Sequence, residues 1–213
     1  MTQTHSFRSL RVVLALVVML ALVGVVAAQD SECPLGGYID DSGDCSFGIT
    51  VTVAYPDWLS ESEAASAAVA ALLNATRDQF LSWMMTPVEE FYRGGFLDIS
   101  YEEYEHGAAL RSIVFLTSEY TGGAHPNSYY ASVKVDTIAD RELTLADDIF
   151  QPGVDAIAVL QPLVVAQLVE QQGEYADLEW ISDGTDSFED YTAWAINAGT
   201  LELFFAPYQV AAY

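Results

Sequence analysis

Alternation of apolar and polar residues marks the strands that the chain is predicted to form. In residues 47–55, Ile49, Val51 and Val53 fall on one face and threonines fall on the other, which is typical of a half-buried strand. Three later runs are rich in β-branched and aromatic residues and are separated by short turns, which predicts an antiparallel meander. They are residues 96–104, 109–120 and 129–137.

Helical spacing of apolar residues predicts two helices. The first follows Ser60-x-x-Glu63, a predicted capping box, and runs to about Met85. Its apolar stripe consists of Val69, Leu72, Leu73, Phe80, Trp83 and Met84. The second helix spans residues 155–172 and contains Pro162, which is expected to kink it. Residues 173–187 are polar and are expected to form a loop.

The C-terminal part of the chain is predicted to form a β-hairpin. Residues 190–196 and 201–205 read as two strands joined by a turn at Asn197-Ala198-Gly199. The sequence therefore predicts one α+β domain over residues 47–213, in which an antiparallel sheet (a meander plus a C-terminal hairpin) packs with two helices.

Turn residues interrupt the meander between its second and third strands. Gly122 and Gly123 allow backbone angles closed to other residues, and Pro126 pushes His125 toward an extended conformation. We expect a hairpin loop over residues 120–130 that presents one imidazole beside several tyrosines. This loop could contact a sugar, a metal or a protein, or sense pH; alternatively, the imidazole bonds its own loop and the glycines only make the turn. The candidate binding residues are Tyr120, Gly122, Gly123, His125, Asn127, Tyr129 and Tyr130.

Residues 1–28 have the pattern of an export signal. Arg8 and Arg11 precede an apolar run over residues 12–26, and Val26-Ala27-Ala28 forms a small-residue cleavage site. We expect cleavage after Ala28 and a secreted, extracytoplasmic bacterial protein. The apolar run is long enough that an uncleaved membrane anchor is the alternative.

Both cysteines lie in the segment that follows, residues 29–46. Cys33 and Cys45 enclose a loop rich in Gly and Asp, and in an oxidising compartment they are expected to pair as a structural disulfide. No histidine lies close in sequence to complete a metal site, so no metal or other cofactor is predicted.

The charge of the chain is strongly negative. The sequence has 31 acidic and seven basic residues, a formal net charge of −24, and two of the basic residues lie in the predicted signal. Such a field excludes a nucleic-acid partner and favours cations or cationic proteins. It is also explained by solubility or by adaptation to salt.

Four segments occur in an order that resembles a known family. They are a strand ending in Tyr55-Pro56, then Tyr-Thr-Gly-Gly-Ala-His-Pro at 120–126, Leu-Thr-Leu-Ala-Asp-Asp-Ile-Phe at 143–150 and Leu-Glu-Leu-Phe-Phe-Ala-Pro-Tyr-Gln-Val at 201–210. Residues 47–213 thereby resemble an extracellular bacterial domain family of uncharacterised function. Its members include the ectodomain of the lysozyme-sensing anti-sigma-V factor (RsiV-like) and the non-catalytic part of a peptidoglycan deacetylase (PdaC-like).

The resemblance implies a domain of the cell envelope that recognises a wall-active protein, such as a lysozyme-like cationic hydrolase, or a wall glycan such as peptidoglycan. The family pattern usually continues beyond the Pro207-Tyr208 segment, so a truncated C-terminus is expected. Only about ten residues precede the apolar run, too few for the cytoplasmic segment that the anti-sigma relatives carry.

Catalytic patterns are weak. After the predicted signal only His106 and His125 remain, and they do not have the ligand spacing of the Asp and two His of a deacetylase metal site; no nucleophile-elbow motif occurs. Paired carboxylates at Glu89-Glu90, or at Glu102-Glu103 with Glu105, leave glycan hydrolysis open. We therefore predict a non-enzymatic binding domain that acts through the 120–130 loop, with a glycan hydrolase or a structural accessory module as alternatives.

Overall fold

The computed structural model describes residues 38–212 except 40, 44, 47 and 86–93. The chain divides into two compact units, Met1–Glu32 and Cys33–Tyr213, and the described residues all belong to the second. The predicted signal segment and Cys33 lie outside the described residues, so export and the disulfide stay predictions. Among the described residues, no helix combines the length and apolar character needed to cross a membrane.

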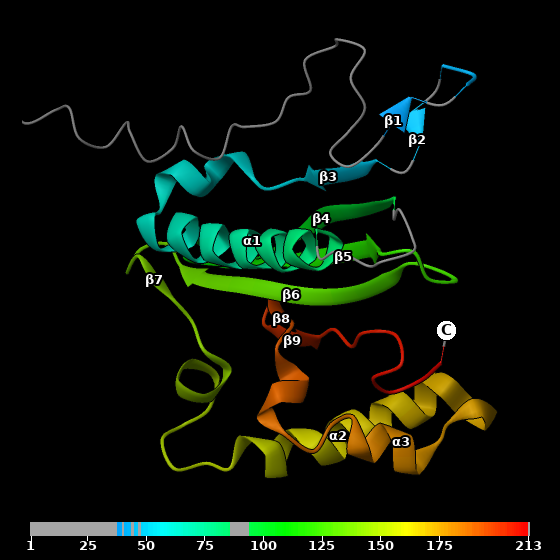
Figure 1. The fold of residues 1–213 in the computed structure, drawn as a ribbon. Coiled ribbons are helices and arrows are strands. Elements are labelled where there is room, and N and C mark those ends of the chain that lie inside the picture. Colours follow the sequence, from blue (N-terminus) through cyan, green and yellow to red (C-terminus); the bar gives the residue numbers. More distant parts are fainter. Residues whose placement is uncertain (1–37, 40, 44, 47, 86–93, 213) are drawn as a thin grey trace, which may run out of the picture. The chain divides into compact units, whose positions relative to one another are not determined.

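A five-stranded sheet organises the described unit, with the strand order β3-β4-β5-β6-β7 (Figure 1). Its strands are β3 (Ile49–Val53), β4 (Gly95–His106), β5 (Leu110–Tyr120), β6 (Asn127–Asp136) and β7 (Arg141–Glu142). Strands β4, β5 and β6 pair antiparallel in sequence order, which confirms the predicted meander. A separate two-stranded ladder joins β1 (Tyr38–Ile39) and β2 (Cys45–Ser46).

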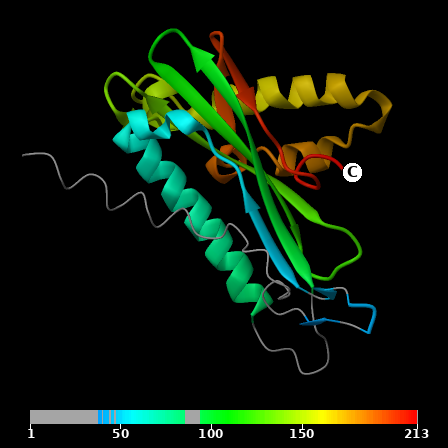
Figure 2. The same cartoon turned by 90° about the horizontal axis from the view of Figure 1, so that it is seen from above.

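One strand departs from the antiparallel pattern. Strand β3 pairs parallel with β4, with Ile49 opposite Gly95 and Val53 opposite Ile99. Parallel neighbours need a crossover connection, and helix α1 (Glu63–Met84) lies in it. Figure 2 shows β3 running along the edge of the sheet beside α1.

Helix α1 covers one face of the sheet and buries its apolar stripe there. The core on this face joins Val69, Leu73 and Phe80 of α1 to strand residues Leu97, Ile99, Phe115 and Val133. The predicted capping box at Ser60 is wrong, because residues Asp57–Glu61 form a 3-10 turn. Helix α1 begins only at Glu63. Ser62 is the N-cap residue, and its hydroxyl accepts a hydrogen bond from the Ala65 amide at 3.0 Å.

The C-terminal elements pack on the opposite face. Strands β8 (Trp194–Asn197) and β9 (Thr200–Leu203) form the predicted hairpin, and its turn places Ala198 and Gly199 at positive φ. Helix α2 (Ala156–Gln172) matches the predicted second helix. Helix α3 (Leu178–Asp183) lies within the segment that was predicted to be only a loop, and Asp177 caps it. A second core lies here, formed by Leu143, Leu145, Leu160, Val164, Tyr191 and Trp194.

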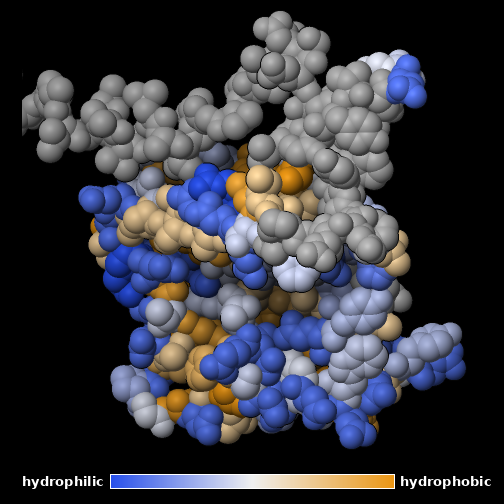
Figure 3. All heavy atoms as spheres, viewed as in Figure 1, coloured by the Kyte–Doolittle hydropathy of each residue, from blue (hydrophilic) through white to orange (hydrophobic). Residues whose placement is uncertain are grey.

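The predicted α+β class is confirmed, with a third short helix and one parallel strand pair added. Short turns of 3-10 or π helix connect the main elements at Leu145–Ile149, Gly173–Tyr175 and Phe188–Tyr191. Hydrophilic side chains, with smaller apolar areas between them, occupy much of the lower part of the face drawn in Figure 3.

Candidate functional site

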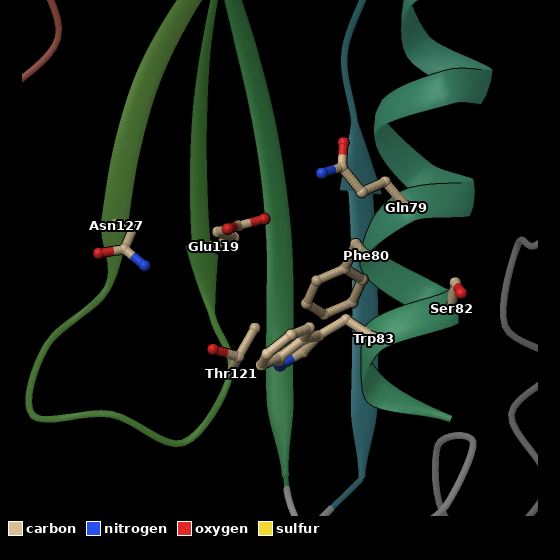
Figure 4. A pocket seen from close by; sticks show the side chains of 7 residues that line it. All are labelled: Gln79, Phe80, Ser82, Trp83, Glu119, Thr121 and Asn127. Carbon is tan, nitrogen blue, oxygen red and sulfur yellow. The ribbon is translucent and has the colours of Figure 1, made fainter. Parts of the chain in front are cut away.

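A groove of about 460 Å³ lies between the C-terminal half of α1 and the end of the β5–β6 hairpin. The described residues that line it are Gln79, Phe80, Ser82, Trp83, Glu119, Thr121 and Asn127. Figure 4 shows the Phe80 and Trp83 rings projecting from α1, while Glu119, Thr121 and Asn127 come from the hairpin.

The local structure explains why these residues meet. Residues four apart share one side of a helix, so Gln79 and Trp83 lie on one side of α1. On the sheet, Glu119 and Asn127 are direct cross-strand partners, and both belong to the face that α1 covers. Thr121 follows immediately after β5, at the start of the hairpin loop.

The two aromatic residues of the groove differ in exposure. The Phe80 side chain belongs to the core and is 2% exposed, whereas Trp83 is 59% exposed. An exposed indole offers a large flat apolar surface together with an N–H donor. The groove thus combines an aromatic wall with two amides, two hydroxyls and one carboxylate.

Glu119 receives one polar contact from the neighbouring strand. The Tyr129 hydroxyl donates to its carboxylate at 3.5 Å. Burial, together with the negative charge of Glu119, raises the pKa of Tyr129 to about 12, so this phenol keeps its proton at neutral pH. Glu119 is the only ionisable side chain among the described residues that line the groove.

The structure divides the predicted tyrosine cluster between the two faces of the sheet. Tyr129 faces α1, as its bond to Glu119 requires. Tyr130 faces the other way and its ring lies 5.7 Å from that of Phe204, while the Tyr120 ring stacks on Phe96 at 6.0 Å. Successive residues of a strand point to opposite faces, so Tyr129 and Tyr130 cannot line one surface together.

The loop tip carries the remaining predicted residues. Gly122 has φ +94°, as predicted, but Gly123 is not in the left-handed region. His125 is exposed, and its Nδ1 lies 2.9 Å from the Pro126 carbonyl oxygen, so Nδ1 is the donor. This contact fits the alternative in which the imidazole bonds its own loop, and a role in binding stays a prediction.

Of the predicted site residues, the structure brings only Asn127 to the described lining of the groove. Trp83 was not predicted as a site residue, because its helical spacing placed it in the apolar stripe of α1 that was expected to be buried. The signal that could have indicated an exposed side chain was its position. Trp83 lies near the end of α1, beside the buried positions Phe80 and Met84.

The structure describes one of the two predicted carboxylate groups, Glu102, Glu103 and Glu105 of β4. Glu102 and Glu103 alternate in β4 and so face opposite sides of the sheet. Glu103 accepts a hydrogen bond from Trp58 Nε1 at 2.5 Å, and Glu105 forms a salt bridge with Arg111 at 3.4 Å. Glu89 and Glu90 lie outside the described residues. No group of three potential metal ligands occurs in the described part of the chain.

Comparisons with known proteins place the chain among bacterial proteins of related sequence. Residues 147–213 match the DUF3298 family, described as a protein of unknown function. This match confirms the predicted family resemblance. It covers α2, α3, β8 and β9, whereas the groove residues precede it.

Two curated relatives add context. The chain is 29% identical over 117 residues to the peptidoglycan-N-acetylmuramic acid deacetylase PdaC of Bacillus subtilis, a match that covers 54% of this chain and 25% of PdaC. It is 26% identical over 208 residues to Esterase Rv3036c of Mycobacterium tuberculosis, covering 90% of this chain and 86% of the esterase. A crystal structure of a DUF3298 family member from Bacteroides fragilis superposes with a TM-score of 0.48 at 19% identity, covering 68% of this chain and 62% of that one.

Proposed function

We propose that the chain is a non-enzymatic, extracytoplasmic binding domain that recognises a glycan of the bacterial cell wall in the groove beside the 120–130 loop. The observation that carries this proposal is the lining of the groove. A sugar ring has an apolar face that packs on an aromatic ring, here Trp83, and hydroxyls that bond to amides such as Gln79 and Asn127.

The size of the groove suits such a ligand. Ligand sites in proteins have volumes of about 300–1,000 Å³ and combine apolar walls with a few polar groups that fix orientation. The volume of about 460 Å³ falls within this range. The wall component of the proposal is supported by the predicted export signal and by the relative PdaC, whose name places its activity on peptidoglycan.

The test is calorimetric titration of the purified chain with soluble peptidoglycan strands and with an N-acetylglucosamine tetramer. Trp83→Ala is expected to weaken binding about tenfold, because loss of an aromatic stacking surface removes roughly 0.5–1.5 kcal/mol beyond area burial. Tyr175→Ala is the matched control, since Tyr175 is 83% exposed and is not among the residues lining the groove. Absence of binding to both glycans, or equal effects of the two substitutions, would overturn the proposal.

A second candidate ligand is a cationic wall hydrolase such as lysozyme, and the charge distribution favours it. Residues 142–213 contain 13 acidic residues and neither Lys nor Arg. Charges at the rim of an interface mainly accelerate encounter with an oppositely charged partner. Titration with hen lysozyme at low and at raised salt tests this candidate: association should weaken as salt rises, and no association at low salt excludes it.

Enzymatic activity is the competing hypothesis. A relative that matches over 90% of the chain is named an esterase, and glycan hydrolysis was an alternative from the sequence. Incubation with p-nitrophenyl acetate tests ester hydrolysis, and the appearance of new reducing ends on peptidoglycan tests glycan cleavage. Turnover of either compound above the buffer rate would contradict a purely binding function.

A further inference from the structure

We infer that the ligand of the groove carries a free ammonium group, as in an amino sugar without its N-acetyl group, and that Glu119 is the counter-ion for it. This inference rests on the proposed glycan-binding function and names the class of sugar that the groove selects.

The described residues provide no cation to balance the Glu119 carboxylate. No salt bridge in the described part of the chain involves this carboxylate, and the hydrogen bond that it accepts there is the 3.5 Å contact from the Tyr129 hydroxyl. A carboxylate accepts up to about four hydrogen bonds, so the described residues leave most of its acceptor capacity for a ligand. The described arginines are paired elsewhere: Arg77–Asp78 at 2.8 Å, Arg111–Glu105 at 3.4 Å and Arg141–Asp148 at 2.6 Å.

The surroundings of this carboxylate are partly apolar. Phe80 and Trp83 form an apolar wall on the opposite side of the groove (Figure 4). A charge pair beside apolar walls is less screened than the same pair in water. The indole face is itself attractive to an ammonium ion placed within about 6 Å of its centre. Carboxylate and indole therefore favour the same chemical group.

Anionic and neutral sugars fit the groove less well than a cationic one. An anionic sugar would meet both Glu119 and the negative field of a chain that carries a net charge of −24. An N-acetylated sugar can use the aromatic wall and the amides Gln79 and Asn127, but it leaves the charge of Glu119 uncompensated. A sugar with a protonated amine uses every chemical feature of the lining.

The experiment compares two tetrasaccharides that differ only at nitrogen, a glucosamine tetramer and an N-acetylglucosamine tetramer, by calorimetry with the full chain. The glucosamine tetramer is expected to bind at least tenfold more tightly, and its affinity should fall as salt rises. Glu119→Gln should remove this preference. Glu174→Gln, which removes the same charge from an exposed turn outside the groove, should preserve the preference.

The outcomes separate the two levels of the proposal. Equal affinity for both tetramers, or an undiminished preference in Glu119→Gln, overturns the ammonium inference but leaves glycan binding standing. If neither tetramer binds and soluble peptidoglycan strands do not bind, both the ammonium inference and glycan binding are overturned. L-Lysine amide carries an amine but no sugar. If it bound as tightly as the glucosamine tetramer, the groove would bind amines in general, and the proposal that its ligand is a sugar would be overturned.

Discussion

The Lys134 ammonium lies 4.5 Å from the centre of the Trp194 ring, on the face of the sheet opposite the groove. The lysine is 6% exposed, and its Nζ donates to the Ser132 carbonyl oxygen at 3.0 Å and to the Ser132 hydroxyl at 3.2 Å. The same hydroxyl accepts a hydrogen bond from the Trp194 amide at 2.9 Å. Lys134 therefore holds β6 against β8, inside the core rather than at the surface.

This burial predicts an unusual pH dependence of stability. Burial lowers the pKa of Lys134 to about 8, against an opposing effect of Glu142. The unfolded chain keeps the lysine proton to about pH 10.5, so between these values the unfolded state binds more protons and the free energy of unfolding rises with pH. The rise attributable to Lys134 is roughly 2 kcal/mol between pH 7.5 and 9.5.

Urea unfolding of the parent chain and of Lys134→Met over this pH range measures the effect. The substitution should flatten the rise, whereas Arg77→Met, which removes an exposed cation, should retain it. Identical slopes in the parent and in Lys134→Met would contradict the assignment. The range stops below pH 10 because Tyr129, whose pKa is raised to about 12, contributes stability that is lost above pH 10.

The start of α1 supplies a second prediction. The Ser62 hydroxyl accepts a hydrogen bond from the Ala65 amide and donates to the Asp140 carboxylate at 2.7 Å. Ser62→Ala should lower the free energy of unfolding by about 1 kcal/mol, the usual effect of losing an N-cap. The hydrogen bond from Ser62 also holds the pKa of Asp140 below its ordinary value, so the substitution should raise that pKa, which NMR titration measures.

Ser60→Ala is the matched control for this cap. Ser60 is the residue that the sequence pattern selected, but its hydroxyl makes only a 3.5 Å contact with the Asp57 carbonyl oxygen. Its replacement should change stability by less than about 0.5 kcal/mol, as at most surface positions. A larger effect at Ser60 than at Ser62 would restore the capping box that the sequence suggested.

Local patterns predicted most of the fold because they act within one element. The period of the apolar residues in α1 and the alternation in β4, β5 and β6 depend only on neighbouring residues. The pairing of β3 with β4 could not be predicted in this way, since it depends on the edge of the sheet to which α1 returns the chain.

In the candidate site, too, the local features were predicted from the sequence and the tertiary ones were not. Asn127 was predicted because it lies within the conspicuous turn chemistry of the 120–130 loop. Gln79 and Trp83 reach the site only because the C-terminal half of α1 lies beside the end of the β5–β6 hairpin, which is a tertiary relationship. The placement of Tyr129 and Tyr130 on opposite faces of the sheet could have been predicted from the sequence, because adjacent residues of a strand point to opposite faces.

The two glycines of the loop give a third prediction. Gly122 has φ +94°, a conformation that side chains rarely adopt, so Gly122→Ala should lower the free energy of unfolding by about 1 kcal/mol. Gly123 is not in this region, and a Cβ atom added there would meet only the His125 carbonyl oxygen at 3.9 Å. Gly123→Ala should therefore be neutral within about 0.5 kcal/mol in urea unfolding. Equal losses in both variants would contradict the distinction.

The last prediction separates the groove from the loop tip as the binding surface. Asn127 lines the groove, whereas His125 does not belong to its lining and bonds the carbonyl oxygen of Pro126. Asn127→Ala should weaken binding of the N-acetylglucosamine tetramer about fivefold, as expected for one lost hydrogen bond of about 1 kcal/mol. His125→Ala should change the affinity by less than about twofold, because it leaves the lining intact.

Asn197→Ala is the matched control for loss of an amide. Asn197 lies at the end of β8, where its side-chain nitrogen donates to Glu202 at 2.7 Å, outside the groove. Calorimetric titration of the three variants should therefore rank Asn127→Ala as the only one with weakened binding. If His125→Ala weakened binding while Asn127→Ala did not, the binding surface would lie at the tip of the loop and the groove would not take part in binding.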